Sequence, residues 1–223
     1  MSYCDYHHPL ERDLGTNRNL TSTCEGAYLG MNNIFVLSAG RVASTTFANA
    51  CKHITNFSSA HESRAGMLGA DRLDFPAAHI EIDNRLVWFL AQLQSRFASD
   101  VGYVYLTRDK EEIARSYVQR WHLNESIVRA YGHGLLMKPH IKKSERLGIC
   151  RDYVESTDFM IRHFLQDKPN KLSIDVRQLS DEFEMFFNWI GAKGNLASCI
   201  SELSIYSNKN KSGLINKLWR LLK

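Results

Sequence analysis

Ile34-Phe-Val-Leu-Ser-Ala-Gly-Arg-Val-Ala-Ser-Thr-Thr-Phe47 combines a short apolar run, a tight turn and the start of a helical pattern. The apolar run over 34–37 predicts a buried strand, which is broken near Gly40. Apolar residues then recur at the spacing of one helix face, which predicts a helix over 44–54. The free N–H groups and the dipole at a helix N-terminus favour an anion. The sequence therefore predicts a phosphate-binding loop.

The side chains of this loop suit an anion, although the loop is not of the Walker type. Arg41 supplies a cation, and Ser44, Thr45 and Thr46 supply hydroxyl groups. The Walker pattern G-x-x-x-x-G-K-[ST] is not matched, because its second glycine and its lysine are missing. The alternative interpretation is a buried strand that leads into a capped helix with no ligand.

A second strand–helix pair carries the same kind of chemistry. The run 102–107 predicts another buried strand, which ends at Arg108 and precedes a helix predicted over 110–121. Ser116 lies eight residues after Arg108, about two helical turns along. Arginine binds phosphate oxygens bidentately, so this pair can bind a further phosphate. The alternative is a surface ion pair between Arg108 and Asp109.

Together these two segments resemble the sulfotransferase family that uses 3′-phosphoadenosine 5′-phosphosulfate (PAPS). In that family an (R/K)-x-G-[ST]-[ST] loop holds the 5′-phosphosulfate, and an arginine with a serine eight residues on holds the 3′-phosphate. The resemblance implies the following cofactor-binding residues: Arg41, Val42, Ala43, Ser44, Thr45, Thr46, Arg108 and Ser116. Ala43 stands where the family usually has glycine, and its methyl group disfavours a positive φ.

The resemblance also implies the reaction. A sulfuryl group would pass from PAPS to an acceptor hydroxyl on a carbohydrate, lipid or small metabolite, leaving adenosine 3′,5′-bisphosphate (PAP), and no metal would be required. Arg41 would neutralise the charge that develops on the leaving phosphate. Glu62 is the expected general base and His61 its rival. The alternative is that both residues only cap a loop and pair with Arg64.

Strands that alternate with helices predict an α/β fold of three layers, with a parallel central sheet flanked by helices, similar to P-loop NTPases. The remaining predicted elements are a short strand at 57–59, a loop over 63–78, a long helix over 82–97, a helix over 152–166, a strand over 171–176, and a helix that Ser180 caps and Gly191 ends.

The segment around the start of the predicted long helix leaves two interpretations open. Glu81 and Arg85 are four residues apart, which favours an ion pair on one helix face. The alternative is that His79, Glu81 or Asn84 faces the acceptor.

The chain divides into an irregular arm over 1–32, an α/β domain over 33–208 and a basic amphipathic tail over 209–223. A lid or insertion is expected over 122–150, with residues such as His122 lining the acceptor pocket. Lys209 and Lys211 resemble the basic loop that closes on the 3′-phosphate in the family. We expect the tail to pack on the domain, and contact with an anionic membrane is the alternative.

Composition narrows the classes of function. The net charge of +4 is mild, which suits an anionic cofactor and does not call for nucleic acid. The five cysteines are scattered, without a C-x-x-C pair, which indicates reduced thiols. The sequence has no signal pattern and no apolar run of about 20 residues, so we expect a cytoplasmic protein of the bacterial type. The competing functions are a nucleotide kinase or NTPase, and a non-catalytic binding module.

Overall fold

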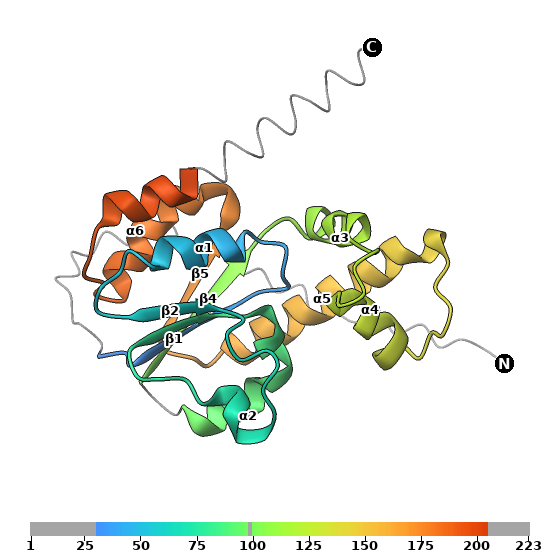
Figure 1. Ribbon diagram of the computed structural model, residues 1–223, viewed down its shortest axis with the longest axis horizontal. Helices are drawn as coiled ribbons and strands as arrows, with labels where there is room; N and C mark the ends of the chain where they lie inside the picture. Colours follow the sequence, from blue (N-terminus) through green and yellow to red (C-terminus); the bar gives the residue numbers. More distant parts are fainter. Residues whose placement is uncertain (1–29, 98–99, 205–223) are drawn as a thin grey trace, which may run out of the picture.

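The core of the protein is a parallel sheet of five strands in the order β2-β3-β1-β4-β5. The computed structural model describes residues 30–97 and 100–204. The strands are β1 (Asn33–Leu37), β2 (Ser58–His61), β3 (His79–Ile82), β4 (Val101–Thr107) and β5 (Lys171–Asp175). This sheet, with helices on both faces, confirms the predicted three-layer α/β fold (Figure 1).

Side chains alternate along β1 between two hydrophobic clusters, one on each face of the sheet. Ile34 and Val36 belong to the cluster that includes Phe47 of α1 (Ser44–Cys51) and the phenylalanines of α6 (Leu179–Trp189). Phe35 and Leu37 belong to the other cluster, which includes Leu93 of α2 (Leu90–Arg96). Figure 1 shows α1 and α6 on one side of the sheet and α2 on the other. The strongly apolar sequence of β1 follows from this burial on both faces.

The strand order places a crevice at the carboxyl ends of β1 and β4. After β1 the chain continues to β2 and β3 on one side of it, whereas β4 and β5 lie on the other side. Ligands of open α/β sheets bind where the strand order reverses in this way. The loop with Arg41 follows β1, and Arg108 follows β4 immediately before α3 (Lys110–Gln119). Both arginines therefore border this crevice.

The prediction of one long helix over 82–97 is wrong. His79–Ile82 forms strand β3, which pairs with both β1 and β2. A 3₁₀ helix, η2 (Asn84–Phe89), follows, and the α-helix begins only at Leu90. The predicted cap of α6 is also wrong, because the N-cap residue is Gln178 and Ser180 lies inside the helix.

The segment predicted as a lid contains short helices: α4 (Ile127–Ala130), the π-helix η3 (Tyr131–Leu135) and η4 (Lys143–Glu145). The long helix α5 (Arg146–Leu165) begins earlier than predicted and packs against α3. The 63–78 loop contains a 3₁₀ turn, η1 (Gly69–Leu73), and η5 (Val176–Gln178) precedes α6. Most of the predicted N-terminal arm, the 209–223 tail, Lys209 and Lys211 lie outside the described residues.

Candidate active site

The loop between β1 and α1 is held close to α3. The hydroxyl of Tyr117 on α3 donates a hydrogen bond to the carbonyl oxygen of Ala39 at 2.7 Å, and the Gly40 N–H donates to Ser38 Oγ at 3.2 Å. Gly40 has φ +80°, and a Cβ atom there would lie 2.2 Å from the Tyr117 oxygen. Only glycine meets both requirements, so the tight turn depends on this residue.

Ala43 adopts the conformation that its side chain disfavours. It is the N-cap residue of α1, with φ 57° and ψ 26°, and it makes no side-chain capping hydrogen bond. Arg41 also has a positive φ, of 60°. A left-handed backbone costs an L-residue roughly 1–2 kcal/mol, and such strain is often found at functional sites. The loop thus keeps the glycine-like backbone although the glycine is absent.

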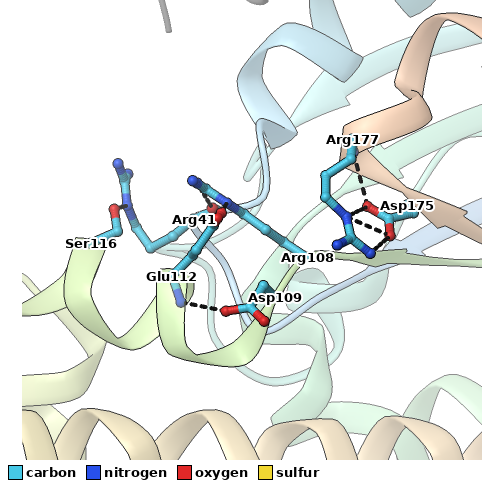
Figure 2. A network of polar contacts seen from close by, with 7 residues as sticks. All are labelled: Arg41, Arg108, Asp109, Glu112, Ser116, Asp175 and Arg177. Carbon is cyan, nitrogen blue, oxygen red and sulfur yellow. Dashed lines mark hydrogen bonds and ion pairs between the residues drawn. The ribbon is translucent and has the colours of Figure 1, made fainter. Parts of the chain in front are cut away.

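The structure brings Arg41, Arg108 and Ser116 together (Figure 2). Arg41 Nε donates to Ser116 Oγ at 3.1 Å, and Arg108 Nη1 donates to the Arg41 carbonyl oxygen at 3.2 Å. Arg108 Nε also pairs with Glu112 of α3 at 2.8 Å. Residues that are 75 positions apart in the sequence therefore form one polar network at the crevice.

A cleft of about 680 Å³ opens beside this network. Its lining residues are Gly40, Arg41, Ser44, Thr45, His61, Glu62, Asn84, Arg85, Tyr117, Arg120 and the segment 122–127. Arg108 lines a second cavity, of about 160 Å³, together with Ala39 and Thr107. Three predicted loop residues, Val42, Ala43 and Thr46, are part of neither lining, and Val42 is fully buried in the core. Ser116 of α3 is not part of either lining.

Both candidate bases face the cleft from the carboxyl end of β2. His61 Nε2 is 2.9 Å from Ser44 Oγ, at the start of α1. Glu62, with φ 52°, forms an ion pair between its Oε2 and Arg85 Nη1 at 2.5 Å, and both side chains are about one-third exposed. The expected pair of Glu81 with Arg85 is therefore wrong. It fails because Glu81 lies on a strand rather than on a helix face.

Arg64 does not pair with either base. Its Nη1 donates to the carbonyl oxygen of Asp71 at 2.9 Å, within the same surface loop. Arg85, which sequence reasoning assigned to another partner, is thus the cation next to Glu62. Sequence reasoning also missed Tyr117 of α3 and Arg120, which lines the cleft just after α3. Only the position of Arg120 before the predicted lid pointed to it.

Asp83 directly follows β3, the strand adjacent to β1, and is the carboxylate there to compare with the magnesium-binding aspartate of P-loop NTPases. Its Oδ2 contacts Arg72 Nη2 at 2.5 Å, and its Oδ1 accepts the Arg85 N–H at 2.7 Å. Burial raises the pKa of Asp83, against the opposing effect of these two hydrogen bonds. Among the described residues, no group of three or more His, Cys, Asp or Glu side chains is placed to hold a metal ion.

Comparison with known proteins gives a structural match only. No family model matches the chain, and no curated protein sequence matches it. Among solved structures, the chain is similar to mouse sulfotransferase SULT7A1 complexed with PAP, with a TM-score of 0.54 and 13% sequence identity. The match covers 77% of this chain and 64% of the mouse chain, so it spans less than two-thirds of that protein. The chain therefore has a sulfotransferase-like fold. No helix within the described ranges has both the length and the apolar character needed to cross a membrane.

Proposed function

We propose that this protein is a sulfotransferase that moves a sulfuryl group from PAPS to an acceptor hydroxyl. The observation that carries the proposal is the polar network of Arg41, Arg108 and Ser116 at the carboxyl ends of β1 and β4. Arg41 and Arg108 line two separate cavities and are linked through the backbone carbonyl oxygen of Arg41, an arrangement that suits a ligand with two separated phosphate groups. The fold similarity to a protein solved with PAP supports the same ligand class.

The loop and α1 would hold the 5′-phosphosulfate. Ser44 and Thr45 line the cleft at the N-terminus of α1, where free N–H groups and the helix dipole favour negative charge. Arg41 would neutralise the leaving phosphate. Arg108 and Ser116 would hold the 3′-phosphate, which would replace Glu112 as the partner of Arg108 and Arg41 as the partner of Ser116. Lys209 and Lys211 stay predictions, since they lie outside the described residues.

The reaction needs one proton acceptor. The acceptor oxygen forms a bond to sulfur, the bond from sulfur to the 5′-phosphate oxygen breaks, and the acceptor proton passes to a base. Glu62 is our assignment for that base, because it is an acidic residue that lines the same cleft as Ser44 and Thr45. His61 is the alternative, because its ring already contacts the Ser44 hydroxyl. The segment 122–127 and Arg120 would contact the carbohydrate, lipid or metabolite acceptor.

Thermal-shift measurements test this function. PAP should raise the melting temperature in the presence of EDTA, since a ligand that binds only the folded state stabilises it. Stabilisation by ATP that requires magnesium would instead indicate a nucleotide kinase or NTPase. A response to neither nucleotide would indicate a binding module without this cofactor.

The identity of the base can be tested separately. In Glu62→Gln we expect turnover to be lost while the Kd for PAP stays within about twofold of wild type, because Glu62 would contact the acceptor rather than the nucleotide. Turnover is measured as release of PAP in cells or extracts that supply acceptors, followed by a search for sulfated metabolites. Retained turnover in Glu62→Gln would move the assignment to His61.

A further inference from the structure

A buried polar network lies directly behind Glu62. The carboxylate of Glu81, which is fully buried on β3, accepts the Ser63 N–H at 2.8 Å and the Ser63 hydroxyl at 2.7 Å. It also pairs with His79 Nε2 at 3.0 Å. The other ring nitrogen of His79, Nδ1, is 2.8 Å from Ser58 Oγ. The network thus runs from the sheet edge at Ser58 to the residue that follows Glu62.

Burying this network makes an unfavourable contribution to the free energy of folding. Glu81 is 0% exposed and His79 is 5% exposed, and the ring of Phe75 stacks on His79 at 5.7 Å. Taking charged groups out of water has a desolvation penalty that pairing repays only when the geometry is good. A hydrophobic pair at these two positions would give a buried strand without that penalty. The presence of the polar His79–Glu81 pair at these positions therefore points to a role beyond stability.

A second carboxylate, at the end of β3, contacts the residue that pairs with the Glu62 side chain. Asp83 pairs with the buried Arg72 and accepts the N–H of Arg85, whose guanidinium binds Glu62. The Glu62 N–H itself donates to the carbonyl oxygen of Ile82 at 3.0 Å. Residues at the end of β3 and just after it thus hold the Glu62 N–H, the Ser63 N–H that follows it and, through Arg85, the Glu62 carboxylate.

We propose that Glu81 is a positioning residue that, through Ser63, holds the Glu62 carboxylate in its place in the cleft. Glu62 has a left-handed backbone with φ 52°, a conformation that is unfavourable for an L-residue and that surrounding contacts must stabilise. The Glu81–Ser63 bonds supply that support on the C-terminal side. The importance for turnover rests on the proposed function, but the geometric claim does not.

Two serines provide a matched pair of variants. Ser63→Ala removes the hydroxyl between Glu81 and the segment after Glu62, whereas Ser58→Ala removes the hydroxyl at the other end of the same network. Both changes delete one hydrogen bond to the His79–Glu81 pair. A purely structural role for that pair predicts similar consequences. A positioning role predicts that only Ser63→Ala disturbs Glu62.

The first measurement is nuclear magnetic resonance of the Arg85 guanidinium nitrogens, assigned by their loss in Arg85→Lys. We expect the signals in Ser63→Ala to move toward those of Glu62→Gln, where the ion pair is absent, and the signals in Ser58→Ala to stay at the wild-type position. Equal shifts in both serine variants, or no shift in Ser63→Ala, would overturn the inference.

The second measurement is turnover. Ser63→Ala should lower kcat about tenfold, because a misplacement of about 1 Å can slow a reaction that much or more, with the KM for PAPS unchanged. Ser58→Ala should retain wild-type kcat. Calorimetric titration of the wild-type protein with PAP separates the proposed function from the positioning of Glu62. Failure to bind PAP would reject the proposed function. The Arg85 signals test the positioning of Glu62 independently of that result.

Discussion

Single residues in the loop between β1 and α1 determine whether an anion can approach its backbone. Gly40, Arg41 and Ala43 all have positive φ angles, between 57° and 80°. The sequence showed the candidate ligands here, because Arg41, Ser44 and Thr45 are local to one motif. It did not show that alanine would keep the conformation of the family's glycine, nor that Tyr117 of a distant helix would contact this loop at Ala39.

Ala43→Gly should stabilise the protein. Glycine removes the strain of the left-handed backbone but adds freedom to the unfolded chain, so we expect a net gain of about 0.5 kcal/mol in the free energy of unfolding. Urea denaturation measures it. Ala48→Gly, in the interior of α1, is the matched control and should lose about 1 kcal/mol or more. A loss of similar size in both variants would contradict the assigned strain at Ala43.

Gly40→Ala should damage both stability and ligand binding. The new methyl group would meet the Tyr117 hydroxyl at 2.2 Å, at a φ that alanine avoids, so we expect a loss of about 1–3 kcal/mol in the free energy of unfolding. The affinity for PAP should fall as the loop shifts. Gly66→Ala, with no heavy atom within 4 Å of its Cβ position, should change the free energy by less than about 0.5 kcal/mol. Equal behaviour of the two variants would refute the close approach.

At the scale of elements, local patterns predicted most of the strands and helices but failed around β3. The apolar residues over 82–97 follow helical spacing by chance, because a strand, a 3₁₀ helix and an α-helix succeed one another there. Glu81 made the strand hard to predict, because a charged residue inside a buried strand is rare. Its hydrogen-bond partner Ser63 also lies in another segment of the sequence. Periodicity cannot reveal such long-range compensation. The pairing of Glu62 with Arg85 was missed for the same reason.

An ion pair between α3 and α5 is expected to make the free energy of unfolding depend on pH. Arg151 of α5 donates two hydrogen bonds of 2.8 Å to Glu111 of α3, and Arg115 adds a further charge. The hydrogen bond from Arg151, followed by the charge of Arg115, lowers the pKa of Glu111 from 4.5 to about 2. A carboxyl group with a lowered pKa in the folded state contributes stability above its unfolded pKa and loses it as the pH falls.

Glu111→Gln should therefore be less stable than wild type at pH 7, and the difference should disappear as the pH falls from about 4.5 toward 2. Urea denaturation across this range measures the difference, which added salt should reduce because the pair is exposed. Glu184→Gln, at an exposed position of α6, is the control and should leave the pH dependence unchanged. A difference for Glu111→Gln that persists to pH 2 would contradict this cause.

At the scale of the whole molecule, the position of the candidate site depends on the strand order. The sheet places β1 between β3 and β4, so the loops after β1, β2 and β4 meet at one edge. Alternation of strands and helices predicted a parallel sheet, and the two motifs predicted that Arg41 and Arg108 would follow strand ends. The shape of the cleft could not be predicted, because the segment 122–127 lines it together with residues of the loop after β1, of α1 and of β2 that are far away in the sequence.

The most direct test of the central claim compares PAP with adenosine 5′-monophosphate, which lacks the 3′-phosphate, by calorimetric titration of wild type and Arg108→Ala. Charge-assisted hydrogen bonds contribute about 1.5–3 kcal/mol, so the Kd for PAP should rise about 10- to 100-fold while the Kd for the monophosphate stays nearly constant. Arg115→Ala, at an exposed position on α3, the helix that follows Arg108, should change neither Kd. Equal losses for both nucleotides in Arg108→Ala would contradict a cofactor bound by two arginines at its two phosphate ends.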